Sequence, residues 1–392
     1  MEMHQQLAID FSSERAQKQL RHIEELIKEV YKNQQVSTKD LEIRDQVINR
    51  IKDAFYKASH KDYPIKITGE ILISGFGSCH NGSWNQEKSD IDVTAVFFDS
   101  LTHNHHQLIK MCSKIICKVA RAGTLIYVPA SRVPILKFIE DESGIQVDFN
   151  VNNLLGISNS NLIFTYTQID QRFHIMNVFL KWWAKSVGII GAAYGYLSSY
   201  AMTLMIIAFL QNTEPPVLPC LQERLLRDQR QQTVYYPVSI EELDSKRRRH
   251  NYSTKDINKK VYCMYETDAF FEKDLKVIQQ FYMPKEENTK SVAQLIYEFF
   301  YFYVYDFDSA NMVINIKEAG SDSVARKGRN GQKFKGGAGF TQKFHRDRFP
   351  FSIVDPFEVQ RNPGCSVKFH SAAHKKIIAQ FRAALDKFNF EK

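Results

Sequence analysis

Residues 75–82 read Gly-Phe-Gly-Ser-Cys-His-Asn-Gly, and residues 89–92 read Ser-Asp-Ile-Asp. An apolar β-type run, Ile-Leu-Ile-Ser, comes directly before them at 71–74. A glycine-rich turn after a strand brings backbone N–H groups close to phosphate oxygens. No Gly-Lys-Ser or Gly-Lys-Thr follows, and the glycine spacing differs from the dinucleotide-binding fingerprint, so neither a P-loop nor a Rossmann turn is predicted. The stretch predicts instead a phosphate-facing turn between two strands.

The second of these strands opens with two carboxylates, Asp90 and Asp92. Side chains alternate along a strand, so both point to the same face. A third carboxylate, Asp148, lies in the β-like run Ile-Gln-Val-Asp-Phe-Asn-Val at 145–151. Like charges this close repel unless a cation lies between them, and hard oxygen ligands favour Mg²⁺ or Mn²⁺. Two such ions can activate a 3′-hydroxyl and stabilise a departing pyrophosphate. The alternative for Asp-x-Asp alone is a surface turn.

Outward from this stretch the pattern is mixed α/β. A helix is expected around 105–121, and further strands are expected at 91–98, 123–129, 132–139 and 144–151. Toward the C-terminus helices dominate, as shown by apolar residues at helical spacing: Ile169, Phe173, Met176, Leu180, Trp183 and Val187. Other helices are expected at 198–211, 292–303 and 370–390. We expect no regular structure in two polar segments, 222–260 and 317–348.

These patterns predict an α+β fold with a mixed sheet and a mainly helical second domain. We expect a catalytic domain over 50–162 and a helical domain over 163–392, with the N-terminal helices of 1–49 packing back on the helical domain. The nucleotide is expected in the cleft between the domains, where water is most easily excluded.

Composition is consistent with a soluble nucleic-acid enzyme. Apolar residues make up 44% of the chain, and its formal net charge of +8 suits RNA or DNA better than a membrane. The six cysteines form no Cys-x-x-Cys pair, which favours free thiols in a reducing compartment. The N-terminus lacks a signal-peptide core, and the longest apolar run, 200–210, is too short to span a bilayer. We expect a cytoplasmic protein; the basic run at 246–249 leaves a nuclear location open.

The motifs together resemble a family. Gly-Phe-Gly-Ser…Ser-Asp-Ile-Asp-Val, Val-Asp-Phe-Asn-Val-Asn-Asn…Ser-Asn-Ser, Phe-Leu-Lys-Trp-Trp-Ala-Lys, Tyr-Leu-Ser-Ser-Tyr and Val-Asp-Pro-Phe-Glu follow one another between about residues 71 and 367. This series is similar to that of the terminal uridylyltransferases and cytoplasmic poly(A) polymerases of the DNA polymerase β-like nucleotidyltransferase superfamily. The resemblance covers three quarters of the chain.

The resemblance implies a role for each matching residue. It assigns the metal ions to Asp90, Asp92 and Asp148, and it also assigns to Asp148 the proton of the RNA 3′-hydroxyl. It implies a nucleotide site whose residues grip the triphosphate (Gly77, Ser78), contact the ribose (Asn159), neutralise the β- and γ-phosphates (Lys181, Lys185, with the Ser199 hydroxyl), stack on the base (Tyr200) and lie near its edge (Asp355, Glu358).

One departure concerns the choice of base. Uridylyl-specific members often place a histidine three residues after the Asp-Pro-Phe-Glu glutamate, where this chain has Arg361. The expected activity is therefore addition of UMP from UTP to RNA 3′ ends, with ATP-using poly(A) polymerase as the alternative. An enzyme forming 2′–5′ oligoadenylate and an inactive RNA-binding scaffold are two others. We see no motif for an RNA-recognition domain or a zinc knuckle, so RNA specificity is expected to come from the enzyme's own basic surface or from a protein partner.

Overall fold

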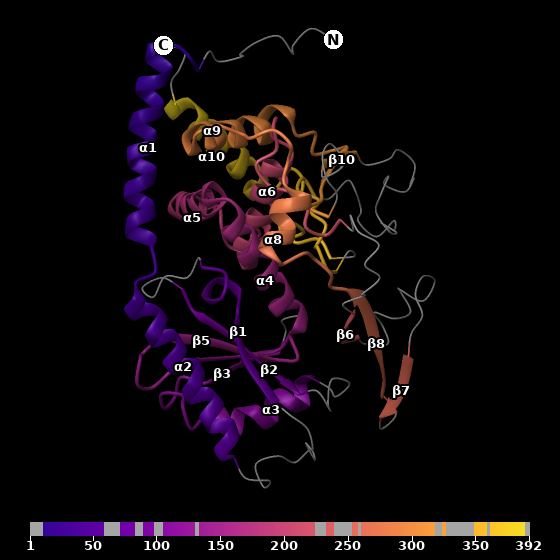
Figure 1. Ribbon diagram of the computed structural model, residues 1–392. Coiled ribbons are helices and arrows are strands. Elements are labelled where there is room, and N and C mark those ends of the chain that lie inside the picture. Colours follow the sequence, from indigo (N-terminus) through magenta and orange to yellow (C-terminus); the bar gives the residue numbers. More distant parts are fainter. Residues whose placement is uncertain are drawn as a thin grey trace. The chain divides into compact units, whose positions relative to one another are not determined.

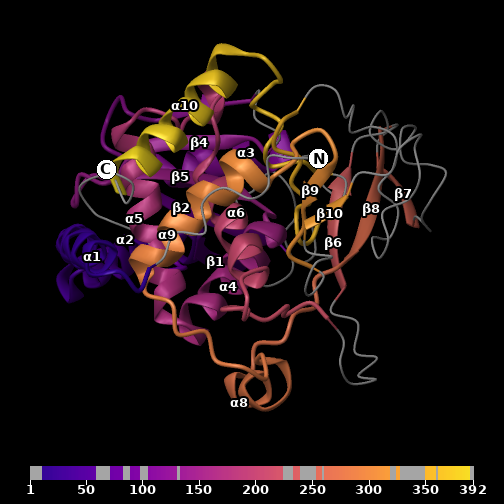
Figure 2. The same cartoon turned by 90° about the horizontal axis from the view of Figure 1, so that it is seen from above.

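The computed structural model describes residues 11–58, 71–82, 89–97, 105–129, 133–223, 233–238, 253–257, 260–317, 324–326, 349–358 and 361–388. The chain divides into two compact units (Figure 1 and Figure 2). The helical unit comprises Met1–Gln34, Tyr166–Leu226 and Glu272–Lys392, and the sheet unit comprises Gln35–Thr165 and Arg227–Phe271. The predicted α+β class is confirmed.

The sheet unit is built on five strands in the order β1-β2-β5-β4-β3. Their bounds are β1 Ile71–Phe76, β2 Ile91–Phe97, β3 Ile126–Val128, β4 Ile135–Ile139 and β5 Gln146–Val151. β2 and β5 run parallel, and every other neighbouring pair in this sheet is antiparallel. The two parallel strands are neighbours in the interior of the sheet. Because they run in the same direction, their first residues lie side by side at the same end of the sheet.

Helices α2 (Thr38–Lys57) and α3 (His105–Ile116) cover this sheet. A capping box starts α2: the Ser37 hydroxyl accepts from the Asp40 N–H at 3.1 Å, and the Asp40 carboxylate accepts from the Ser37 N–H at 2.9 Å. Phe55 of α2 stacks on Phe149 of β5, with ring centroids 5.8 Å apart. The apolar face of α2 therefore belongs to the core of the sheet unit.

The helical unit holds the remaining long helices, α1 (Glu14–Gln34), α5 (Gln171–Ser186), α6 (Ser199–Gln211), α9 (Val292–Tyr301) and α10 (Ala372–Phe388). α1 packs against α5, α9 and α10. α6 is buried on all sides from Ala201 to Gln211. α4 (Leu154–Ile169) contains the boundary between the units, which falls after Thr165. No helix in the described part of the chain is long and apolar enough to cross a lipid bilayer.

Two features differ from the expectations. The sequence predicts that both N-terminal helices pack on the helical domain, whereas α1 belongs to the helical unit and α2 to the sheet unit. Periodicity identifies the apolar face of a helix but not the core that covers it.

The second difference lies in the polar segments, which contain strands: β6 (Thr233–Val238), β7 (Ser253–Ile257) and β8 (Lys260–Asp268) form a sheet in the order β6-β8-β7, and β10 (Val324–Arg326) pairs with β9 (Met312–Ile314). The β-branched and aromatic residues of Thr-Val-Tyr-Tyr-Pro-Val supported a strand despite polar surroundings. The basic run at 246–249 and residues 327–348 lie outside the described residues.

Candidate active site

The glycine-rich turn joins β1 to a short 3₁₀ turn, Gly77–Cys79. Gly77 has a φ of +69°, and a Cβ built there would lie 2.4 Å from a carboxylate oxygen of Asp92. Only glycine therefore lets the turn lie directly against Asp92. The Gly77 N–H donates to the Ser160 hydroxyl at 2.6 Å, and the Gly77 carbonyl accepts from the N–H groups of His80 and Asn81. The turn is thus held from α4 and by its own backbone.

The carboxylates lie beside this turn on two parallel strands. Asp92 is paired with Phe76 of β1 on one side and with Asp148 of β5 on the other. Residues in register on neighbouring strands point to the same face, so Asp92 and Asp148 share one face of the sheet. Asp90 comes just before β2, two residues ahead of Asp92. The structure brings the three predicted carboxylates together at one edge of the sheet.

Their charges interact. Burial is the main cause that raises the pKa of Asp92 to about 8, and the carboxylates of Asp90 and Asp148 raise it further, while the Lys137 ammonium lowers it. Lys137 of β4 forms an ion pair with Asp148 Oδ2. Asp148 is 8% exposed, and its Oδ1 is buried without a hydrogen-bond partner among the described residues.

This donor set fits a hard divalent cation. In the described residues, no three His, Cys, Asp or Glu side chains are close enough to form a ready-made coordination shell. Nevertheless, Asp148 offers a buried oxygen that accepts no hydrogen bond from the part of the chain that is described, and three acidic groups meet beside a glycine turn. Carboxylate oxygens are the ligands that Mg²⁺ prefers, and a cation here would offset the carboxylate repulsion that adds to the effect of burial on the pKa of Asp92.

Two more predicted residues belong to the sheet unit. Ser78 is partly buried in the 3₁₀ turn, directly after Gly77. Asn159 is 8% exposed in α4, one residue before Ser160, which holds the turn. Both therefore lie on elements that contact the glycine turn.

The other predicted residues belong to the helical unit. Lys181 and Lys185 are one turn apart on α5, with Lys181 partly buried and Lys185 exposed. Burial, and then the charge of Lys185, lowers the pKa of Lys181 to about 8. Ser199 is the first residue of α6, whose N-cap is Ser198; the Ser198 hydroxyl accepts from the Ala201 N–H at 3.0 Å.

A third group in this unit surrounds Tyr200. The Tyr200 hydroxyl donates to Asp355 Oδ2 at 3.2 Å, and Arg361 Nη1 lies 3.3 Å from the same oxygen. The Arg361 guanidinium lies over the Tyr200 ring, with its Cζ 5.6 Å from the ring centroid. Asp355 is 1% exposed, and its Oδ1 accepts from the Phe357 and Glu358 N–H groups. Sequence-distant Tyr200 and Arg361 thus meet at one buried carboxylate.

Sequence reasoning missed two residues of the sheet unit that contact this site. Lys137 is the single charged residue in the strand Ile-Leu-Lys-Phe-Ile, a signal that a buried partner lies opposite it. Ser160 holds the glycine turn, but nothing in its local sequence indicates that contact.

Comparison with known proteins identifies the class. Residues 23–168 match the model of the central palm domain of mitochondrial-like poly(A) RNA polymerases, and residues 291–361 match that of Cid1-family poly(A) polymerases. The chain belongs to the family of terminal uridylyltransferases and related poly(A) polymerases.

Particular relatives and solved structures agree with this class. Terminal uridylyltransferase cid1 of Schizosaccharomyces pombe is 26% identical over 81% of this chain and 69% of its own length. Terminal uridylyltransferase 7 of Homo sapiens is 26% identical over 83% of this chain, which spans only 18% of that protein. Poly(A) RNA polymerase GLD2 of Danio rerio is 34% identical over 39% of this chain and 30% of its own length. The crystal structure of the Cid1 poly(U) polymerase with MgGTP superposes with a TM-score of 0.69, at 22% identity over 95% of this chain and 96% of that one.

Proposed function

We propose that this chain is a template-independent RNA nucleotidyltransferase that adds UMP from UTP to RNA 3′ ends. The observation that carries the proposal is the group formed by Asp90, Asp92 and Asp148, next to a turn that only glycine can form. Relatives named terminal uridylyltransferases support the substrate, and a Cid1 structure in complex with the short product ApU supports an RNA end as the acceptor.

Asp90, Asp92 and Asp148 are the residues that would hold Mg²⁺ or Mn²⁺. Such ions lower the pKa of a bound hydroxyl and stabilise charge on a leaving pyrophosphate. Asp148 Oδ1 is the acceptor that we assign to the proton of the RNA 3′-hydroxyl, because in the described residues it has no hydrogen bond of its own. Lys137 keeps Asp148 Oδ2 engaged, and so orients the carboxylate.

The remaining residues are assigned to the nucleotide. Gly77 and Ser78, in the glycine turn, are assigned to the triphosphate, and Asn159 is assigned to the ribose hydroxyls. Lys181 and Lys185 share one edge of α5, as two cations for the β- and γ-phosphates require. Ser199 lies at a helix N-terminus, which favours anions, and its hydroxyl is assigned to the same phosphates.

The base is assigned to Tyr200, Asp355, Glu358 and Arg361. The ion pair with Asp355 and the contact with the Tyr200 ring hold the Arg361 guanidinium beside the residue proposed to stack on the base. A guanidinium has only donors, so it can bond a uracil carbonyl but meets the adenine amino group as a second donor. The Arg361 side chain is 43% exposed in the free protein, so this discrimination requires the bound base to cover it. An unmatched donor covered in this way costs ~1–3 kcal/mol, which corresponds to ~5–150-fold discrimination in favour of UTP.

This assignment predicts the effect of Arg361→Ala. We expect wild-type kcat/KM to be higher for UTP than for ATP, and the ratio to fall in the variant. Arg382→Ala, an exposed arginine on α10, is the matched control and should leave the ratio unchanged. A wild type that prefers ATP would identify a poly(A) polymerase. An unchanged ratio in Arg361→Ala would remove Arg361 from base selection.

The carboxylate group is tested with labelled oligo-RNA and each NTP in turn. Asp90→Ala with Asp92→Ala should abolish nucleotide addition, because Asp148 alone would remain of the three proposed metal ligands. Asp53→Ala, an exposed acid on α2, removes one charge from the same unit and should retain full activity. Residual activity above about 1% of wild type, a loss below ~2.7 kcal/mol, would refute the metal assignment. A wild type that binds RNA but incorporates no nucleotide would instead identify a scaffold.

Two further assignments are part of the proposal. We place the protein in the cytoplasm, with the nucleus as the alternative; a Cid1-fold neighbour is described as a cytoplasmic RNA terminal U-transferase. A protein partner is proposed to supply RNA specificity, and no membrane is assigned as a partner. Co-purification of the full chain with and without ribonuclease treatment would separate protein partners from RNA-bridged ones.

A further inference from the structure

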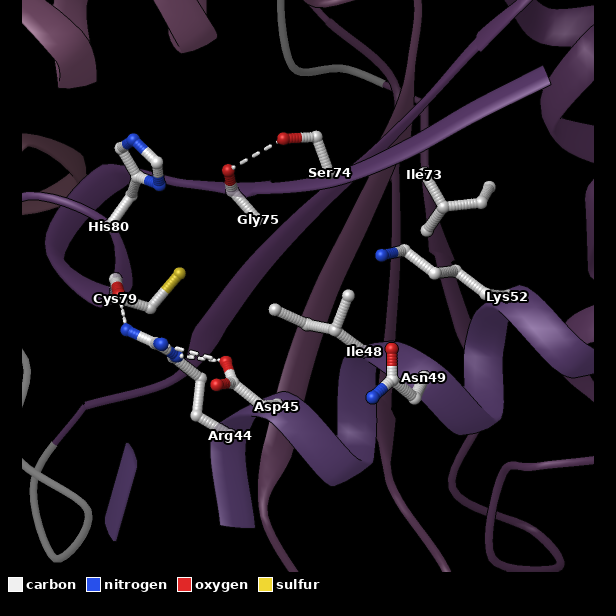
Figure 3. Close-up of a pocket in the computed structure, with 10 residues that line it drawn as sticks. All are labelled: Arg44, Asp45, Ile48, Asn49, Lys52, Ile73, Ser74, Gly75, Cys79 and His80. Atoms are coloured by element: carbon white, nitrogen blue, oxygen red, sulfur yellow. Dashed lines mark hydrogen bonds and ion pairs between the residues drawn. The ribbon is translucent and has the colours of Figure 1, made fainter. Parts of the chain in front are cut away.

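A pocket of about 360 Å³ lies in the sheet unit, between α2 and the strand and turn that carry the glycines (Figure 3). None of the residues assigned to metal, nucleotide or base lines it. Its walls come from two segments distant in sequence: Arg44, Asp45, Ile48, Asn49 and Lys52 on α2, and Ile73, Ser74, Gly75, Cys79 and His80 on β1 and the turn.

Regular elements form these walls. Arg44, Ile48 and Lys52 are spaced four residues apart, so they follow one stripe of α2. On the other side, β1 is the edge strand of the five-stranded sheet. A Cβ built at Gly75 would lie 2.9 Å from Ile48 Cδ1, so the helix and the strand approach closely at the floor of the pocket. The pocket is therefore built on fixed backbone.

The charges in the pocket do not balance. The Arg44 guanidinium donates to the Asp45 carboxylate at 2.7 and 2.9 Å and to the Cys79 carbonyl at 2.7 Å. Asp45 is thus neutralised within the pocket. In the described part of the chain, the Lys52 ammonium has no hydrogen-bond or ion-pair partner. Figure 3 shows this partly buried side chain reaching past Ile48 toward β1. The Lys52 ammonium is therefore a positive charge in this polar cavity that no described acidic group neutralises.

The remaining polar groups could also serve an oxyanion. Asn49 offers an amide N–H, and the Ser74 hydroxyl, which donates to the Gly75 carbonyl at 3.1 Å, would serve an oxyanion by turning to donate to it instead. His80 on the rim bonds Asn161 at 2.8 Å and lies 6.1 Å from the half-exposed Phe164 ring. A positively charged pocket next to aromatic rings, here those of His80 and Phe164, is typical of sites that bind a nucleic-acid phosphate and stack the neighbouring nucleobase.

We propose that this pocket is a second phosphate site, in which Lys52 holds either a phosphodiester of the RNA or the phosphate of a free nucleotide. It goes beyond the proposed function, because the residues concerned lie outside the proposed catalytic machinery. The site lies behind the glycine turn, since Gly75 and Cys79 face it whereas Gly77 faces Asp92. An anion there would contact the support of the turn rather than the proposed metal site.

The test compares Lys52→Met with Lys57→Met in the full chain. Both remove one lysine from α2 and keep an unbranched side chain, but Lys57 is exposed and outside the pocket. One arm measures binding of a single-stranded oligo-RNA with a 3′-deoxy end, by fluorescence anisotropy without divalent metal. The other measures binding of inorganic phosphate and of UTP by calorimetry, also without metal. Neither arm depends on turnover, so an inactive enzyme would refute the proposed function and not this site.

In the RNA arm, loss of one phosphate contact should weaken binding about tenfold and reduce the slope of log K against log salt by about 0.7. This result, with phosphate and UTP unaffected, assigns the site to RNA. A similar loss for phosphate or UTP alone assigns it to a free nucleotide. If Lys52→Met behaves like Lys57→Met in both arms, the proposal is overturned.

Discussion

The lowered pKa of Lys181 makes triphosphate binding depend on pH in a way that can be tested. Burial and the neighbouring Lys185 bring this pKa to about 8, so in the free protein Lys181 loses its proton as the pH rises through 8. A triphosphate beside Lys181 favours the charged form, and hence raises the pKa. UTP binding is therefore expected to take up a proton above pH 8.

The size of the effect follows from this pKa. With a pKa of about 8, Lys181 is about nine-tenths charged at pH 7 and about one-tenth charged at pH 9. If only the charged form binds the phosphates, the affinity for UTP falls about tenfold over this interval. Protein stability should change in the opposite direction. Because the lowered pKa means that the unfolded chain binds more protons, the Lys181 contribution to the free energy of unfolding rises between pH 8 and 10.5. The titration of Lys181 therefore does not itself destabilise the fold over this interval.

Calorimetry of UTP binding in two buffers of different ionisation enthalpy measures both affinity and proton uptake. Lys185→Met should weaken binding at pH 7 and move the fall in affinity to higher pH, because the charge that lowers the Lys181 pKa is removed. Lys387→Met, an exposed lysine on α10, is the control and should retain the wild-type profile. An affinity that does not vary between pH 7 and 9, with no proton uptake, would exclude Lys181 from the phosphate site.

Two other predictions concern the sheet unit. Gly77→Ala should abolish activity and cost ~1–2 kcal/mol or more in free energy of unfolding, because φ is +69° and the new Cβ meets the Asp92 carboxylate; a fully active, equally stable variant in urea titrations would contradict the turn geometry. Glu140→Gln should cost about 2–3 kcal/mol, because the carboxylate is 1% exposed and Arg50 bonds it through two N–H groups at 2.8 Å, although Arg50 itself is partly exposed. Burial acts to raise the pKa of Glu140, but bonds from Arg50 and Ser143 lower it overall. The stability that Glu140 contributes should therefore be lost as the pH falls through its lowered pKa. If Glu140→Gln unfolds at the same acidic pH as the wild type, this contribution is absent.

The strands around the carboxylates were predictable because their signals are local. Ile91–Phe97 and Gln146–Val151 are apolar runs with polar residues at the positions that face the site. The same is true of α5, whose apolar stripe leaves Lys181 and Lys185 on one edge. The sequence is sufficient to predict a contact when both residues lie on the same helix or strand.

Contacts across elements were not predictable in this way. The partner of α2 depends on which core its apolar face reaches, and a helical period does not contain that information. The meeting of Tyr200 with Arg361 depends on the loop that carries Asp355, where two backbone N–H groups fix the carboxylate. The resemblance placed these residues near one base, but the cation over the ring came from the structure alone.

Lys137 shows how register and charge depend on one another. β4 and β5 pair Lys137 with Asp148, and the neighbouring pairs are Leu136 with Phe149 and Phe138 with Val147. A shift of one residue would turn every side chain of β4 to the other face and place Lys137 opposite an apolar residue. Asp148 would then lose the only cation that the described residues pair with it. The observed register therefore pairs apolar residues with one another and at the same time places a cation beside a buried carboxylate. We infer that the charge beside the proposed metal site also helps to specify the sheet.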